Sequence, residues 1–134
     1  KHHYVADSVP ADPDGFVRDV SDYPDGTELL LAADVLVTDY SSMMFDFANT
    51  GRPMLFFTYD LDRYKDEIRG FYVDFVGTVP GPLLQTTEQV AAALADTAAV
   101  QAEYADRYAA FRAKFCELDD GAASARVVDR IFSP

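Results

Sequence analysis

Residues 35–57 read VLVTDYSSMMFDFANTGRPMLFF, and this stretch decides the fold. Residues 35–38 form a short apolar run, which is typical of a buried parallel strand. Residues 53–57 form a second such run, with a proline at the first position, where a strand tolerates it. Residues 43–50 between them have helical character, and Gly51 is a typical C-terminal stop. The stretch therefore predicts a compact βαβ unit with a right-handed connection.

Weaker signals lie on both sides of this unit. Residues 16–20 predict a short strand upstream. The acidic cap Asp25, with Glu28 three residues later, predicts a helix that runs to about Ala33. Residues 71–75 alternate with period two and fit either a strand or a loop.

The C-terminal half is predicted to be mostly helical. Residues 77–82 predict a turn-rich crossing, and residues 86–89 carry a capping-box signal for a helix to about Thr97. Four aromatic residues then recur at helical spacing, which favours a core-facing helix over a cofactor or partner face. Gly121 is predicted to end that helix, and residues 122–131 to form the last one. The aromatic residues are Tyr104, Tyr108, Phe111 and Phe115. The residues of the last helix that we expect to point inward are Val127, Val128 and Ile131.

These elements predict an α/β fold with a Rossmann-like parallel sheet and a helical C-terminal tail. Two clear strands, with one or two weaker ones, are few for a doubly wound domain. The helical excess at the C-terminus suggests packing against a part of the protein outside this sequence. We therefore expect residues 1–134 to be a fragment of a larger protein.

Composition excludes several classes of protein. The formal net charge is −12, which argues against broad binding to nucleic acid or to anionic membranes. Cys116 is the single cysteine, so an intrachain disulfide and a cysteine-rich zinc site are excluded and a reduced, cytoplasmic setting is expected. No apolar run approaches the ~20 residues of a membrane span.

Cations gather in one segment of this acidic chain. Four of the eleven basic residues lie between positions 52 and 69. Such a cluster can hold an anionic ligand, but it fits equally well a solvated helix face paired with neighbouring carboxylates. The cations are Arg52, Arg63, Lys65 and Arg69. The carboxylates are Asp60, Asp62, Asp66 and Glu67.

The turn after the first strand of the unit is the candidate ligand site. Ligands of open parallel sheets bind beyond the carboxyl ends of the strands, and Thr38, Ser41 and Ser42 stand at such an end. Amides of a first helical turn and serine hydroxyls suit a phosphate, although serine is also a favoured N-cap residue. Asp46, one turn further, could accept hydrogen bonds from a ribose, or it could be a solvent-facing helix carboxylate.

The common nucleotide and metal motifs are missing from this sequence. It has no G-x-G-x-x-G, which leaves dinucleotide binding of the Rossmann type unsupported, and no P-loop, which excludes Walker-type chemistry. It also has no H-E-x-x-H and no spaced cluster of metal ligands. We therefore expect a nucleotide held at the helix N-terminus, with no metal and no other cofactor.

A family resemblance is carried by residues 19–21, 28–29, 34–42, 45–49, 52–56, 59–61, 64, 69–72 and 80–83. Read together, these segments resemble the CDP-glycerol glycerophosphotransferase family, over about residues 1–94. The spacing from Asp46 to Pro53 is also similar to the E-A-x-A-x-G-x-P element of GT-B nucleotide-sugar transferases, with Asp in place of Glu. The combination is more specific than any single segment.

The resemblance implies a GT-B-type enzyme with two Rossmann-like domains and an active site in the cleft between them. The family transfers glycerol phosphate from CDP-glycerol to a poly(glycerol phosphate)-type acceptor and releases CMP, in teichoic acid or capsule synthesis. Residues 1–134 would be the C-terminal, CDP-glycerol-binding part, while a missing N-terminal domain would supply the general base. The chain alone would bind CDP-glycerol or CMP without turnover. The full-length enzyme would be cytoplasmic and peripheral to the inner face of the membrane, so this chain would meet the membrane only indirectly.

The resemblance also implies roles for individual residues. Ser41 and Ser42 would hold the pyrophosphate of the donor. Arg69 is the first candidate to neutralise that pyrophosphate or the polyanionic acceptor, and Arg63 and Lys65 are further candidate contacts.

A histidine completes the implied site. His3, in a His-Tyr context, would contact the pyrophosphate as an imidazolium and shield the leaving phosphate. The adjacent His2 is the alternative equivalent of the family histidine.

Two other interpretations stay open. The donor domain of a GT-B glycosyltransferase that uses a nucleotide-sugar fits the fold and the Asp46 element equally well. A flavodoxin-like or receiver-like interaction module would use Asp39 at a strand end as a phosphoacceptor. That module also needs acidic metal ligands and a later lysine at a strand end, and neither is evident.

Overall fold

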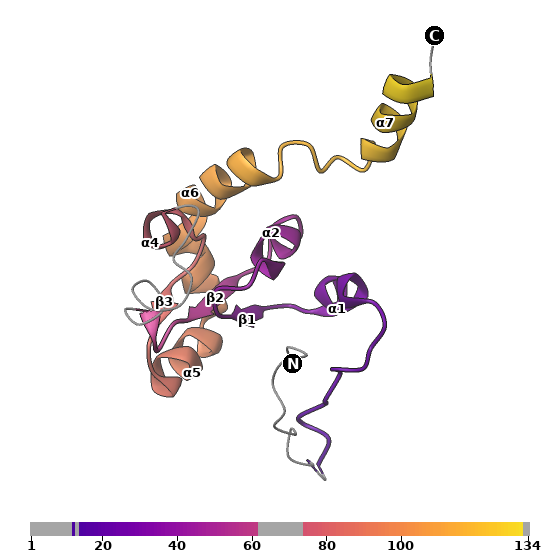
Figure 1. The fold of residues 1–134 in the computed structure, drawn as a ribbon. Coiled ribbons are helices and arrows are strands. Elements are labelled where there is room, and N and C mark those ends of the chain that lie inside the picture. Colours follow the sequence, from indigo (N-terminus) through magenta and orange to yellow (C-terminus); the bar gives the residue numbers. More distant parts are fainter. Residues whose placement is uncertain (1–11, 13, 62–73, 133–134) are drawn as a thin grey trace.

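The computed structural model describes residues 12, 14–61 and 74–132 (Figure 1). Its centre is a three-stranded parallel sheet with the strand order β1-β2-β3. The strands are β1 (Leu36–Thr38), β2 (Met54–Phe57) and β3 (Leu83–Leu84). The register pairs Leu36 with Met54, and Phe56 with Leu83. The predicted α/β class with a parallel sheet is therefore confirmed.

Two helices begin at the predicted caps. In α1 (Gly26–Ala32) the side chain of Asp25 accepts a hydrogen bond from the Thr27 amide. At the start of α5 (Thr87–Ala95), Thr86 and Gln89 form the predicted capping box. The other helices of the described part are α2 (Met43–Ala48), α4 (Phe75–Thr78), α6 (Thr97–Phe115) and α7 (Ala123–Phe132).

Strand β2 lies at the centre of the core. Met54, Leu55 and Phe56 have no exposed surface, and full burial of each such side chain contributes roughly 1.5–3 kcal/mol. Phe47 of α2 and Phe111 of α6 lie in one buried cluster with Met54 and Phe56. The aromatic face of α6 therefore packs on the core, as predicted. Its members that are partly buried against this cluster are Tyr108 and Phe115.

The turn between α2 and β2 is anchored to α1. Gly51 has a φ of 71°, in the left-handed region that favours glycine, and it ends α2 as predicted. The Arg52 guanidinium donates to the carbonyl oxygens of Leu31 at 2.7 Å and Ala33 at 2.6 Å, at the C-terminal end of α1. Arg52 thus has a structural role, and the predicted anion-binding cluster loses one of its four cations.

Gly81 allows β3 to approach β2. A Cβ atom on Gly81 would lie 2.0 Å from the carbonyl oxygen of Met54, which is far inside contact distance. The sequence predicted only a turn-rich crossing over residues 77–82, and β3 begins directly after it. A strand of two residues has no periodicity that a pattern could detect.

The strand predicted for residues 16–20 is wrong. These residues form bends and irregular backbone, and Phe16 is 93% exposed. The side chain of Asp12 accepts hydrogen bonds from the amides of Asp14 and Val17. Such side-chain bonds compete with a strand ladder, and a local sequence signal alone does not provide a neighbouring strand.

The segment predicted as strand or loop at residues 71–75 falls partly outside the described residues. Phe75, its last member, begins helix α4. The side chain of Asp74 caps this helix by accepting a hydrogen bond from the Gly77 amide at 3.1 Å. An N-cap aspartate therefore sets the structure at this point.

The C-terminal tail is helical, as predicted, but its packing differs. Helix α6 ends at Phe115 and not at Gly121. Figure 1 shows α7 set apart from the sheet. Val127, Val128 and Ile131 are 55%, 52% and 64% exposed, so their predicted inward orientation is wrong. A pattern of apolar residues shows that a face is apolar, but not that this chain covers it.

Strand β1 is less buried than predicted. Val37 is 43% exposed, because β1 is an edge strand of the described sheet. Among the described helices, none has the length and apolar character needed to cross a membrane.

Candidate functional site

Two turns meet at the carboxyl edge of the sheet. The register pairs Thr38, at the end of β1, with Phe56 near the end of β2, so the turns that follow these strands are neighbours. The hydroxyl of Tyr40, in the first turn, donates to Oδ1 of Asp60, in the second, at 2.8 Å. This is the edge at which parallel sheets bind ligands.

The first turn is shaped by its own side chains. Oδ1 of Asp39 accepts a hydrogen bond from the Ser41 amide at 3.1 Å, and Oγ of Ser41 accepts one from the Met43 amide at 3.3 Å. Ser42 is the N-cap residue of α2, but its side chain makes no capping hydrogen bond. The prediction that both serines stand at the start of a helix leaving β1 is therefore confirmed. Since α2 has only six residues, its dipole is a minor contributor to ligand binding there.

The two serine side chains differ in exposure and in hydrogen bonding. Ser41 is partly buried and uses its hydroxyl within the turn, whereas Ser42 is exposed. A purely structural role, in which the hydroxyl satisfies a free amide at the start of the helix, therefore fits Ser41 better than Ser42.

Tyr40 is the best-anchored side chain of this turn. Its ring meets the ring of Phe75 edge-on, with centroids 5.5 Å apart, and Phe75 is 2% exposed. Burial raises the pKa of the Tyr40 phenol well above its ordinary value, and the hydrogen bond to Asp60 raises it further. The phenol therefore stays protonated and keeps donating to Asp60.

Two threonines lie at the ends of these strands. The predicted site residue Thr38 is the last residue of β1 and is partly buried. Thr58 directly follows β2 and is fully buried, and its Oγ1 has no hydrogen-bond partner within the described structure. An unpaired buried hydroxyl costs about 1–3 kcal/mol. No sequence pattern predicts this feature of Thr58.

Asp46 is exposed on α2, one turn beyond Ser42. It lies near the C-terminal end of α6, where its charge affects the pKa of the Cys116 thiol. Burial raises the pKa of the Cys116 thiol, and the charges of Asp119 and Asp46 add to this rise while Arg112 opposes it. Asp46 is accessible to a ligand, but no described side-chain hydrogen bond joins it to Ser41 or Ser42.

Five predicted site residues lie outside the described part of the chain. They are His2, His3, Arg63, Lys65 and Arg69. Their roles stay predictions. In the described part, no group of three or more His, Cys, Asp or Glu side chains could hold a metal ion.

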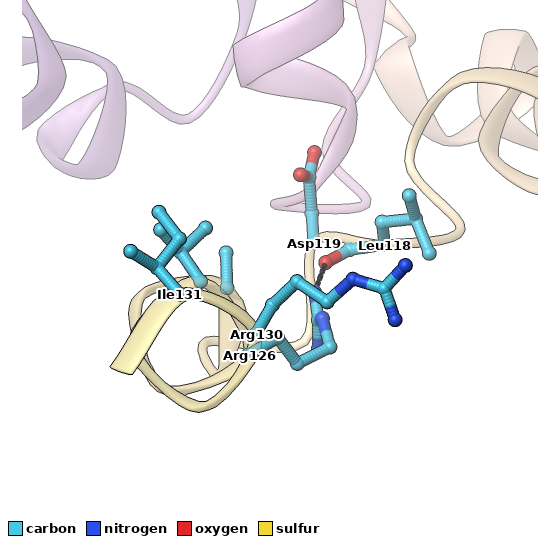
Figure 2. Close-up of a pocket in the computed structure, with 7 residues that line it drawn as sticks. Leu118, Asp119, Arg126, Arg130 and Ile131 are labelled. Carbon is cyan, nitrogen blue, oxygen red and sulfur yellow. Dashed lines mark hydrogen bonds between the residues drawn. The ribbon is translucent and has the colours of Figure 1, made fainter. Parts of the chain in front are cut away.

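A groove of about 420 Å³ lies far along the chain, beside α7 (Figure 2). Leu118, Val127 and Ile131 give it an apolar wall, and Arg126 and Arg130 also line it. Arg126 is held there by Asp120 at 2.7 Å and by the carbonyl oxygen of Leu118 at 2.7 Å. None of the predicted site residues lines this groove.

Nearly the whole chain matches a known protein family. The family described as CDP-glycerol:poly(glycerophosphate) glycerophosphotransferase matches residues 1–133. The chain belongs to this glycerophosphotransferase family. The receiver-like interpretation is thereby excluded.

Curated relatives agree with this assignment. The teichoic acid glycerol-phosphate transferase of Staphylococcus aureus is 45% identical over 130 residues, which cover 97% of this chain and 33% of the relative. The teichoic acid poly(glycerol phosphate) polymerase of Bacillus subtilis is 43% identical, over 98% of this chain and 18% of the relative. This chain thus spans a third or less of the length of these two relatives.

The fold is similar to that of solved structures of a teichoic acid polymerase. The wall teichoic acid polymerase TagF superposes with a TM-score of 0.76 at 42% identity, over 84% of this chain and 28% of that one. A TagF variant soaked with CDPG gives a TM-score of 0.79 at 42% identity, over 88% of this chain and 29% of that one. The α/β fold of this chain is therefore confirmed.

Proposed function

We propose that this chain is the donor-binding part of an enzyme that transfers glycerol phosphate from CDP-glycerol to a poly(glycerol phosphate)-type acceptor. Membership of the family supports this, as do relatives whose names are those of teichoic acid transferases and polymerases. A TagF variant with a similar fold was soaked with CDPG. Residues 1–134 would form the later part of the C-terminal domain, and an N-terminal domain would supply the acceptor site and the general base.

One observation supports the location that we propose for the donor site. Ser42 stands at the carboxyl edge of the sheet with an exposed hydroxyl that does not cap α2. A hydroxyl and a backbone amide presented together at this edge suit a phosphate oxygen of the donor. The Ser41 amide already donates to Asp39, so Ser41 would contribute its hydroxyl proton, and Thr38 would lie behind both serines at the end of β1.

The reaction is attack by an acceptor hydroxyl on the glycerol-bearing phosphorus, with CMP as the leaving group. Catalysis of such a transfer is mostly positioning and electrostatics. The described edge also carries the carboxylates of Asp39 and Asp60, so a bound pyrophosphate would require cations from elsewhere. Arg69 is our first candidate for this charge, and Arg63 and Lys65 would assist or would meet the acceptor.

Two further residues would complete the site. His3, or else His2, would contact the pyrophosphate as an imidazolium and stabilise the leaving phosphate. Asp46 would accept hydrogen bonds from the ribose. We propose no metal and no other cofactor for donor binding.

The biological setting follows from the acceptor. The full-length enzyme would act in the cytoplasm, at the inner face of the membrane, in teichoic acid or capsule synthesis. Its partners would be CDP-glycerol, CMP and a polyanionic acceptor. Nucleic acid is not expected to bind, because the chain carries a net charge of −12.

Calorimetry on the full-length protein tests this function. CDP-glycerol and CMP should bind more tightly than UDP-sugars or GDP-sugars, and binding should persist without added Mg²⁺. A preference for UDP or GDP would indicate a nucleotide-sugar transferase. Strict dependence on Mg²⁺ would contradict the metal-free site.

A further inference from the structure

The turn that carries Ser41 and Ser42 is held to its neighbour by a side-chain bond. Asp39 and Ser41 make hydrogen bonds that stay within the turn. Tyr40, between them, reaches out and donates to Asp60 in the turn after β2, at 2.8 Å. The bond joins residues 20 positions apart in the sequence, and it is partly buried.

The Tyr40 ring is fixed from its other side as well. Phe75 meets it edge-on, and the same Phe75 ring packs against Phe56 of β2 at 5.7 Å. Tyr40 therefore has a ring anchored in the core and a hydroxyl anchored to Asp60. Two fixed points leave little freedom to the backbone of residues 39–42.

We infer that Tyr40 and Asp60 are positioning residues, which hold the Ser41–Ser42 turn in the orientation that receives a donor phosphate. This inference rests on the proposed function, because it presumes that the donor binds at this turn. Neither residue needs to touch the donor. Preorganised hydrogen-bond donors bind a ligand more tightly because no ordering cost remains to be met on binding.

The charge of Asp60 makes the inference testable. A carboxylate repels a phosphate bound nearby, so the presence of Asp60 beside the proposed donor site requires another role for this side chain. Acceptance of the Tyr40 hydrogen bond is such a function, and an amide oxygen can perform it without a charge. Asp60→Asn should therefore keep the turn in place, whereas Asp60→Ala should release it.

The experiment measures the Kd for CDP-glycerol by calorimetry on the full-length protein. Tyr40→Phe and Asp60→Ala should each weaken binding about tenfold, and the double variant should be no weaker than either single one. Asp60→Asn should bind about as tightly as the unmodified protein. Melting curves would establish that each variant is folded at the temperature of the binding measurement.

Tyr23→Phe is the matched control. Tyr23 also donates to a carboxylate, that of Glu28 at 2.5 Å, but this pair is exposed and precedes β1. Its loss should leave the Kd unchanged. In turnover assays, Tyr40→Phe should raise the KM for CDP-glycerol with little change in kcat.

Three results would overturn the inference. They are unchanged binding in Tyr40→Phe, additive losses in the double variant, and a loss in Asp60→Asn as large as in Asp60→Ala. Failure of the unmodified protein to bind CDP-glycerol would instead reject the proposed function. The two failures are therefore distinguishable.

Discussion

The hydroxyl of Tyr108 donates to the carbonyl oxygen of Arg52 at 2.9 Å, and this bond joins α6 to the turn that closes the βαβ unit. The carbonyl oxygen of Ala48, at the end of α2, lies 3.4 Å from the same hydroxyl. A single phenol thus links the helical tail to the unit that carries the candidate site.

Tyr108→Phe should lower the free energy of unfolding by about 1 kcal/mol, because one partly buried hydrogen bond is lost while the ring remains. Urea denaturation would measure the change. Tyr104→Phe, one turn earlier on α6, is the control and should have no measurable effect. Equal losses in the two variants would show that the bond to Arg52 contributes nothing specific.

Tyr108 also predicts an alkaline limit of stability. Burial raises its pKa from 10.0 to about 12, although Arg112 opposes the rise. The protonated phenol is the favoured form in the folded state. Its contribution is therefore complete below pH 10 and is lost as the pH rises towards 12. Denaturation curves between pH 9 and 12 should show a steeper decline for the unmodified chain than for Tyr108→Phe, and parallel declines would contradict the assignment.

Gly81→Ala should destabilise the fold by about 2–3 kcal/mol, since the new Cβ would lie 2.0 Å from the Met54 carbonyl oxygen and would push β3 from β2. Gly26→Ala is the matched control. Gly26 is the first residue of α1, and a Cβ there would meet nothing within 4 Å. It should be neutral or slightly stabilising. Similar melting temperatures for the two variants would argue against the close approach of β3.

Two arginines of the predicted cluster should behave in opposite ways. Arg69→Ala in the full-length enzyme should lower turnover by about 10²-fold and leave stability within ~1 kcal/mol, with partial rescue by Arg69→Lys. Arg52→Ala should instead lower the melting temperature and leave turnover nearly unchanged. The reason is that Arg52 anchors the end of α1 through the carbonyl oxygens of Leu31 and Ala33. Activity and melting temperature of both variants would decide. Near-normal turnover in Arg69→Ala would move the assignment to Arg63 or Lys65.

The βαβ unit was predictable because each of its elements has a local signal. Apolar runs define β1 and β2, and Gly51 marks the end of α2. The false strand at residues 16–20 and the missed strand β3 have a common cause. Whether a segment joins a sheet depends on a neighbouring strand, and neighbours are set by tertiary structure.

The candidate site was predictable only in part. The placement of Ser41 and Ser42 follows from the order strand, turn, helix, which is local information. The bond between Tyr40 and Asp60 depends on the parallel register of β1 and β2, which no local pattern specifies. The exposed apolar face of α7 has a similar origin, since the sequence marks a face as apolar without identifying what covers it.

The most direct test of the donor site is the Kd for CDP-glycerol of Ser42→Ala, measured by calorimetry on the full-length protein. The Ser42 side chain makes no capping bond, so the variant should melt at the same temperature as the unmodified protein. Ser124→Ala, on the exposed helix α7, is the control. We predict about tenfold weaker binding for Ser42→Ala and no change for Ser124→Ala. Unchanged binding in Ser42→Ala would contradict the account, because the donor phosphate would then not reach the edge formed by β1 and α2.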